Sequence, residues 1–303
     1  MIKNMKKIVL WLFIIMIASF SISIILFRNA GVDWNDIADM DDDYSNFEEI
    51  SNVKGKFKKN INEEKSFDIQ GIDDVNISTI SADIRIIPED RNDIRVHFYG
   101  AVASSNEIGS PKLIAEKQNN SLQIKIDHKK LISSGFYSSR IDLDIYVPNE
   151  YSKNIDVKTT SGDIDLGILN IKDISAKSVS GDINADSLYS EKSSFKSTSG
   201  EITLRDFKGM IDAKTTSGDI DIDFNALEND VNIGSISGSI ELGLPNNSGF
   251  YLESKSLSGD IECDFPISIE GKHSERKVNG RVGQDNNRIV LSTTSGDIEI
   301  SKK

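Results

Sequence analysis

The sequence predicts an all-β protein: a β-solenoid of stacked repeats that follows one N-terminal transmembrane helix. Three observations carry this prediction. A Ser-Gly-Asp-Ile motif recurs along the second half of the chain, apolar and polar residues alternate on both sides of each motif, and an uncharged apolar run lies near the amino terminus. Alternation with a period of two is typical of half-buried strands, and self-similarity at a fixed period is typical of solenoids.

Residues 8–27 (IVLWLFIIMIASFSISIILF) predict a transmembrane helix that acts as a signal anchor. The segment contains twenty uncharged residues, which is long enough to cross a bilayer as a helix. Three lysines precede it: Lys3, Lys6 and Lys7. The positive-inside rule then makes residues 1–7 a cytoplasmic tail and places the remainder outside the membrane. The expected location is thus the cell membrane, with a single pass and an extracytoplasmic C-terminal domain.

A cleaved signal peptide is the alternative interpretation of this segment. The best cleavage pattern would end at Ala30, but Arg28 would then occupy a position that prefers a small residue. Residues 28–66 follow as an acidic spacer, and solvated charge runs of this kind are usual in spacers. We therefore expect four parts: the tail, the helix, this spacer, and an adhesin-like solenoid domain at 67–303.

Charge and cysteine content exclude several classes of function. The formal net charge is −13, and an acidic surface repels phosphate backbones, so nucleic acid is not an expected partner. The single cysteine, Cys263, excludes an intrachain disulfide and a multi-cysteine zinc site. Its place in an apolar position of the repeat predicts a small core residue. We expect no catalytic residues, no metal site and no cofactor.

The repeats place one glycine at the same point of each unit. These glycines are Gly162, Gly181, Gly200, Gly218, Gly238, Gly259 and Gly296. The wide gap before Gly296 contains Gly280, which we interpret as a degenerate copy, and Ala82 replaces the glycine in an earlier copy, TISADI. Apolar residues occupy odd offsets before the glycine and even offsets after it. Because side chains alternate with a period of two along a strand, Ser-Gly must be a corner, where glycine can adopt backbone conformations that other residues avoid.

Each unit is then a strand, a Ser-Gly corner, a second strand and a looser return. Units of this size bury a core only when they stack, with parallel pairing between successive coils about 4.8 Å apart. Ser or Thr three residues before the glycine points inward and is expected to hydrogen-bond along the stack. The strands between Phe67 and Asn149 are less regular, and we treat them as the entry part of the same domain.

SGDI repeats behind one amino-terminal membrane helix resemble a bacterial family of adhesin-like β-strand-repeat envelope proteins, including LiaG-like proteins. The resemblance covers roughly Asn76 to Ile300 and is most specific in the T-x-S-G-D-I units and in NGRVGQDNNRIVLSTTSGDIEI. It implies a right-handed parallel β-helix similar to pectate lyases, outside the membrane. It implies no defined activity and no shared catalytic set, and a link to envelope stress only by association.

Three outward rows invite specific chemistry. The acids directly after the glycines would repel one another if stacked, and either a turn-capping role or a calcium ladder would relieve this repulsion. The calcium repeats known from nine-residue units do not match this spacing. A lysine row four residues before the glycines offers a second relief. The threonines two residues before the glycines suggest ice binding, but Val179, Ile236 and Leu257 interrupt their row.

The sequence therefore favours a non-enzymatic envelope protein that presents a solenoid for adhesion-like interaction or stress sensing. Its expected partners are the lipid bilayer, through residues 8–27, and an unidentified cell-wall or membrane-protein partner. The alternative is a carbohydrate-active enzyme, a polysaccharide lyase or hydrolase, because such enzymes use this scaffold. Paired carboxylates in two distinct environments would be needed for glycoside hydrolysis, and the repeats do not single out any pair.

Overall fold

The computed structural model describes residues 57–104, 111–128, 137–270, 274, 276–284 and 287–303. The predicted tail, the predicted transmembrane helix and most of the predicted spacer lie outside these residues. Within the described part of the chain, no helix has the length and apolar character needed to span a membrane. The chain divides into two compact units, and the larger one, made of Lys58–Val102, Ile108–Ile132 and Ser138–Lys303, contains the repeats.

The regular structure of the described residues is β throughout, which confirms the all-β prediction. In chain order the strands are β1 (Phe57–Asp68), β2 (Asp74–Ser78), β3 (Asp83–Glu89), β4 (Asp93–Ser104), β5 (Lys112–Gln118), β6 (Ser121–Asp127), β7 (Tyr137–Pro148), β8 (Asn154–Lys158), β9 (Ile164–Lys177), β10 (Ile183–Lys196), β11 (Ile202–Lys214), β12 (Ile220–Phe224), β13 (Val231–Gly234), β14 (Ile240–Leu244), β15 (Phe250–Ser258), β16 (Ile261–Cys263), β17 (Ser268–Ile269), β18 (Lys277–Val282), β19 (Arg288–Ser295) and β20 (Ile298–Lys302).

Successive coils pair in parallel, as the repeats predict. Strand segments before the corners form one parallel array, which we call the leading sheet, and segments after the corners form a second, the trailing sheet. In the leading sheet, for example, β8 pairs with the end of β9, and Val157 lies opposite Ala176. In the trailing sheet, Ile220 of β12 lies between Ile202 of β11 and Ile240 of β14.

The core lies between these two sheets. Ladders of apolar side chains from both sheets fill it, and Ile202, Ile220 and Ile240 are each 0% exposed. The return segments differ from the prediction in the middle of the stack. There β9, β10 and β11 continue through the return as unbroken strands, because Leu169, Leu188 and Phe207 lie side by side inside it and are buried.

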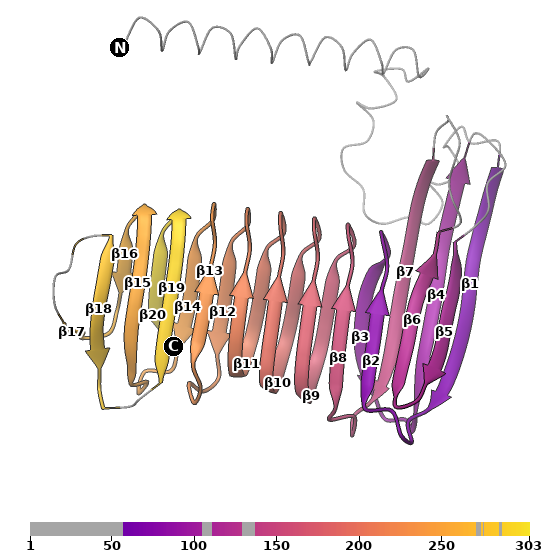
Figure 1. Cartoon of the computed structure of the whole chain (residues 1–303), viewed down its shortest axis with the longest axis horizontal. Coiled ribbons are helices and arrows are strands. Elements are labelled where there is room, and N and C mark those ends of the chain that lie inside the picture. The colour runs from indigo at the N-terminus through magenta and orange to yellow at the C-terminus, as the bar shows by residue number, and fades with distance from the viewer. Residues whose placement is uncertain (1–56, 105–110, 129–136, 271–273, 275, 285–286) are drawn as a thin grey trace, which may run out of the picture. The chain divides into compact units, whose positions relative to one another are not determined.

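The order of the coils in space differs from their order along the chain. The last repeat, β19 and β20, lies between two earlier coils: β19 pairs in parallel with β13 and with β15, and β20 pairs with β14 and with β16. Gly280 is therefore not a degenerate corner, and that prediction is wrong. It lies in β18, which runs antiparallel to β15 and covers its outer edge (Figure 1).

The beginning of the solenoid shows the same arrangement. Strands β2 and β3, which contain the TISADI copy, lie between β6 and β7 on one side and β8 and β9 on the other. Strand β5 then pairs antiparallel with β6. At both ends an antiparallel strand covers the last parallel strand of the leading sheet. This protects an edge that would otherwise offer free backbone groups to another chain.

Candidate interaction surfaces

The corners are the tightest contacts between coils. A Cβ atom added to Gly181 would lie 1.9 Å from the carbonyl oxygen of Gly162, and one added to Gly200 would lie 2.1 Å from that of Gly181. Gly259 and Gly296 adopt the positive φ values that we expected, 158° and 150°, but neither Gly181 nor Gly200 does. Glycine is required there because the carbonyl of the neighbouring coil occupies the space of a side chain. Ala82 begins the row of corners, and the strand that pairs with β3 on its other side, β7, contains no Ser-Gly corner.

A buried hydroxyl ties each corner to the next. Ser178 Oγ accepts a hydrogen bond from the Gly181 N–H at 2.8 Å and donates to the Gly162 carbonyl of the neighbouring coil at 3.5 Å. Ser197 makes the same pair of contacts with Gly200 and Gly181. The predicted role of these inward hydroxyls is thus confirmed. Ser178 and Ser197 thus each satisfy a donor and an acceptor that would otherwise be buried without partners. At later corners the hydroxyl donates to the neighbouring glycine carbonyl, as Thr215 does to Gly200 at 3.2 Å.

The acids after the glycines form a row whose carboxylates bind the neighbouring coil. Asp163 Oδ1 accepts the backbone N–H of Asp182 at 2.9 Å, and Asp182 Oδ1 accepts that of Glu201 at 2.8 Å. The hypothesis that each Asp caps its own turn is therefore wrong in its choice of turn. Charge-assisted hydrogen bonds of this kind offset the repulsion within the row. At its start, burial raises the pKa of Asp83, the hydrogen bond from the Asp163 N–H opposes this, and the charge of Asp163 adds to the rise.

The residues two before the glycines form an exposed row along the corners. Each of its aliphatic members is close to half-exposed: Ile80 at 53%, Val179 at 46%, Ile236 at 53% and Leu257 at 55%. The threonines between them are also exposed. A backbone ladder links the row, because each following serine donates to the neighbouring coil, as Ser180 N–H does to the Thr160 carbonyl at 2.9 Å. The predicted outward direction of these side chains is confirmed.

The outer face of the leading sheet carries a lysine row beside a shallow cleft. The lysine row consists of Lys158, Lys177, Lys196 and Lys214, which are neighbours on four successive strands. The fifth lysine of the predicted row, Lys255, is not their neighbour and lies opposite Ser292 and Lys277. The cleft has a volume of about 360 Å³, and residues of β2, β8, β9 and β10 line it. Its floor contains short polar side chains: Asn76, Asp156, Ser175 and Ser194.

A different polar cluster lies where β3, β7 and β4 meet. Asp144 of β7 is 5% exposed, and its carboxylate accepts hydrogen bonds from Arg85 Nε at 2.7 Å, from the Tyr99 hydroxyl at 3.2 Å and from the Tyr146 hydroxyl at 3.3 Å. Burial and the charge of Asp144 raise the pKa of Tyr99 to about 12. The donors surround a buried carboxylate, which would be costly without them.

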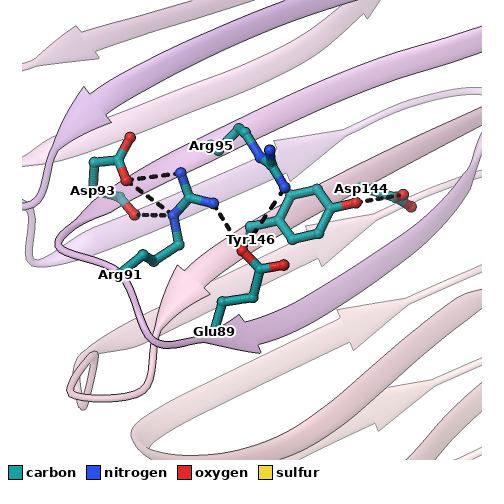
Figure 2. Close-up of polar contacts among 6 residues, drawn as sticks. All are labelled: Glu89, Arg91, Asp93, Arg95, Asp144 and Tyr146. Carbon is teal, nitrogen blue, oxygen red and sulfur yellow. Dashed lines mark hydrogen bonds and ion pairs between the residues drawn. The ribbon is translucent and has the colours of Figure 1, made fainter.

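Figure 2 shows how arginines extend this cluster toward the β3–β4 turn. The Arg95 guanidinium lies over the ring of Tyr146, 4.0 Å from its centroid, a cation–π contact. Arg91 binds Asp93 through Nη2 at 2.7 Å and Glu89 through Nη1 at 2.9 Å. Burial tends to raise the pKa of Asp93, but the hydrogen bonds from Arg91 and Ser66 outweigh it and lower that pKa. Arg91 thus satisfies Asp93 and Glu89, whereas the buried Nε of Arg95 has no hydrogen-bond partner. The contacts indicate a brace between β3, β4 and β7.

Sequence reasoning did not identify this cluster. Its members occupy the outward positions of alternating strands, which the pattern marks only as polar. The residue types could have indicated it. The outward positions of β3 and β4 contain arginine and tyrosine, and those of β7 contain aspartate and tyrosine, whereas the corresponding positions of the repeats carry mostly small polar residues. A search for complementary outward residues on three such strands would have found it.

Cys263 shows what happens to an inward position at the end of the stack. It lies opposite Ile300 in the apolar ladder, as predicted, but it is half-buried because its strand, β16, is the last of the trailing sheet. Burial raises the pKa of its thiol. Among the residues that the structure describes, no group of three or more His, Cys, Asp or Glu side chains is arranged to hold a metal ion.

Comparison with solved structures finds remote likenesses. A "putative cell adhesion protein" from Clostridium sporogenes is 14% identical, with 81% of this chain and 100% of that chain covered and a TM-score of 0.38. A "putative adhesin" from Bacteroides fragilis is 13% identical, with 79% and 97% covered and a TM-score of 0.41. A "putative lipid binding protein" from Parabacteroides distasonis is 15% identical, with 78% and 96% covered and a TM-score of 0.32.

A search among curated proteins finds none that matches. The model of the Toastrack DUF4097 family, in contrast, matches residues 72–301, which includes all the corners and both capped ends of the leading sheet. This range also agrees with the extent of the resemblance that the SGDI repeats indicated. The chain belongs to the Toastrack DUF4097 family.

Proposed function

We propose that this protein is a membrane-anchored, extracytoplasmic, non-enzymatic interaction protein that presents its repeat surfaces to a component of the cell envelope. One observation carries the proposal: the coils display outward side chains in rows along the stack, among them the acids after the glycines and the four neighbouring lysines, so a partner with a repeating structure can make a similar contact several times. Multiple weak contacts of this kind raise affinity without a deep pocket.

The proposed anchor is the apolar segment 8–27, with residues 1–7 in the cytoplasm. The length and charge pattern of that segment support it. The right-handed winding that the family resemblance implies stays a prediction.

The carbohydrate-active enzyme is the competing function. The most enzyme-like group of residues is the cluster around Asp144, where Asp142 lies on the same strand. Arg85 forms ion pairs with both carboxylates, at 2.7 Å to Asp144 and 3.3 Å to Asp142. Two tyrosine hydroxyls donate hydrogen bonds to the Asp144 carboxylate. A general acid needs a proton that it can deliver to substrate, and a carboxylate held by an arginine and two hydroxyls is poorly suited to that task. This arrangement favours the non-enzymatic proposal.

Two experiments test the proposed function. A tag inserted in the 33–56 segment, which precedes β1, should be accessible to antibody on intact cells or spheroplasts, and accessibility only after membrane lysis would refute the outside location. The full chain in detergent should then retain cell-envelope fractions in a pull-down. Failure to retain any envelope fraction, or hydrolysis of envelope polysaccharide by the purified chain, would contradict the proposal.

A further inference from the structure

Four successive coils carry opposite charges on the two sides of their Ser-Gly corners. The lysine row precedes these corners, and one residue after each glycine stands an exposed acid: Asp163, Asp182, Glu201 and Asp219. Between the two rows lie the exposed residues two before the glycines: Thr160, Val179, Thr198 and Thr216. We call these three rows the corner ridge. Because each coil contributes one member to every row, the three rows have the same spacing of about 4.8 Å.

The lysines of the corner ridge are only partly balanced within the molecule. Lys214 forms an ion pair with Asp212 at 2.8 Å, and Lys158 is paired in the same way on its own strand. In the described part of the chain, no ion pair involves the two central lysines, Lys177 and Lys196. These two are neighbours in the register of β9 and β10, and like charges directly opposite each other on a sheet are destabilising. A carboxylate supplied by another molecule would relieve this repulsion.

The acids of the same two coils each keep one oxygen available. Asp182 Oδ1 accepts the Glu201 N–H at 2.8 Å, and Glu201 Oε1 accepts the Thr203 hydroxyl at 2.9 Å. Among the residues that the structure describes, the second carboxylate oxygen of each acid has no hydrogen-bond or ion-pair partner. An ionised carboxylate accepts through both oxygens, so each acid can still bind an ammonium group.

The middle row adds apolar surface between these charges. Val179 is 46% exposed, and Ile80, Ile236 and Leu257 continue the same row beyond the corner ridge and are also about half-exposed. Exposed apolar patches that are rimmed by polar residues mark interaction sites. A partner for the ridge must therefore cover an apolar line, place acids against the lysines and place lysines against the acids.

A second copy of this chain meets all three requirements. If two copies face each other with their stacks running in the same direction, a two-fold axis parallel to the stack brings the lysine row of each copy against the acid row of the other. Lys177 then meets Asp182 of the second copy, and Lys196 meets Glu201. Val179 packs against its own counterpart at the axis. The opposite direction of the stacks would place lysines against lysines.

From this self-complementarity we propose that the corner ridge is the interface of a parallel homodimer. The inference rests on the proposed function and names a second copy of this chain as the partner of its rows. A two-fold interface uses the same surface of both subunits, which is the property that the lysine and acid rows share here. The spacing of the contacts matches without adjustment because both copies are built from the same coils.

The dimer should be weak and should depend on concentration. The row of eight corners is only about 38 Å long, and a narrow strip of this length lies at the low end of specific interfaces. The net charge of −13 on each copy opposes association. Charges farther apart than about 8 Å are largely screened at physiological ionic strength, however, whereas the pairs across the ridge act at contact. Copies that are concentrated in one membrane would compensate for a weak contact.

Cysteine cross-linking of the full chain in membranes tests the contact at the axis. In a Cys263→Ala background, Val179→Cys should form a disulfide-linked dimer on mild oxidation, because the two copies of this residue meet within the distance that a disulfide spans. Ile168→Cys is the control, since Ile168 is 72% exposed but lies outside the ridge. Absence of the Val179→Cys dimer, or equal cross-linking of the control, would overturn the proposal.

Two further cysteines test the direction of the stacks. Chains with Thr160→Cys and chains with Thr216→Cys, distinguished by tags of different size, are mixed before oxidation. In the parallel dimer these corners are three coils, or about 14 Å, apart along the stack, which exceeds the reach of a disulfide. Each variant should therefore cross-link only to itself. A mixed product would indicate antiparallel copies and would contradict the pairing of lysines with acids.

Exchange of charges tests the ion pairs, by co-purification of two differently tagged copies of the full chain in detergent. Lys196→Glu should weaken association at least tenfold because two acids then face each other, and Glu201→Lys should weaken it similarly because two lysines do. An equal mixture of these two variants should return to within about twofold of the wild type, since every contact again joins a lysine to an acid. The control Lys112→Glu changes an exposed lysine of β5 and should have no effect.

Circular dichroism melts verify that each variant folds. Equal association of the wild type, both charge variants and the control would indicate contact through residues 8–27 or another surface, and failure of the mixture to recover would exclude the proposed pairs. Either result refutes the homodimer interface. The pull-down with envelope fractions from cells that lack this chain tests the proposed function separately. If those fractions bind although no ridge-dependent dimer forms, the proposed function stands and this inference fails.

Discussion

Replacement of Ile220 by alanine tests the register of the solenoid. Ile220 is 0% exposed, and its neighbours along the trailing sheet are Ile202 and Ile240, which are also 0% exposed. The substitution removes three carbons. At about 0.8 kcal/mol for each buried carbon, the lost transfer free energy is about 2.4 kcal/mol.

The cavity adds to this loss. Backbone hydrogen bonds hold the strands on both sides of β12 in fixed register, so neither neighbour can move in to fill the space. The free energy of unfolding should therefore fall by about 3–5 kcal/mol, the upper part of the range for buried Ile-to-Ala changes. The matched control is Thr216→Ala, in the same coil and four residues earlier. Thr216 is exposed, and the expected loss is within about 0.5 kcal/mol.

The assay is denaturant unfolding of a fragment that starts near Phe57, followed by far-ultraviolet circular dichroism. The comparison requires that wild type and variants unfold with the same denaturant dependence, which indicates that the coils unfold cooperatively. Similar losses for Ile220→Ala and Thr216→Ala would refute the inward and outward assignment, and with it the explanation of the core.

Three further changes test the corners, the charges and the coil order. Gly181→Ala should lower the free energy of unfolding by about 1–3 kcal/mol or more, because its Cβ would overlap the Gly162 carbonyl. The control Gly234→Ala, whose Cβ would lie 3.2 Å from a serine hydroxyl, should lose much less in the same unfolding assay. Equal losses would contradict the explanation that the neighbouring carbonyl requires glycine. Burial and the charges of Asp221 and Glu299 raise the pKa of Glu241 above its ordinary 4.5, so the folded state loses stability as pH rises through that range. Glu241→Gln should therefore raise the melting temperature at pH 7 but not below about pH 4. An equal gain at both pH values would exclude the charge of Glu241 as the cause. Deletion of 287–303 should also lower the amide hydrogen-exchange protection of residues 250–282, because β19 lies between β13 and β15. Unchanged protection of 250–282 would show that the inserted coil is not required to hold β15 in place.

Much of the repeat architecture followed from local patterns. The change of phase at Ser-Gly indicated a corner, and the structure confirms that Ile220 points inward and Thr216 outward. The inward Ser and Thr hydroxyls were also predictable, because a polar group forced into the core must find a partner, and the corner backbone is the nearest one. These features depend only on side-chain alternation and on the chemistry of a few residues within one repeat.

The candidate surfaces were predictable only in part. The lysine row was visible in the aligned repeats, but which of its lysines are neighbours depends on which coils meet. The cluster joins Asp144 of β7 to Arg85 of β3 and Tyr99 of β4, which lie 59 and 45 residues away in the chain. Such contacts depend on long-range pairing, which no local pattern specifies.

The sequence by itself determined the strand alternation, the corner in each repeat and the parallel stacking of units that cannot bury a core alone. Only the tertiary structure decided the order of the coils, with β19 and β20 inserted between earlier coils and Gly280 placed in an antiparallel edge strand. The physical reason is that the repeats are nearly interchangeable as pairing partners: their motifs fix the register between any two coils but not which two coils meet. That choice depends on burying both edges of the terminal repeats and covering the last parallel strand, which is a property of the whole stack.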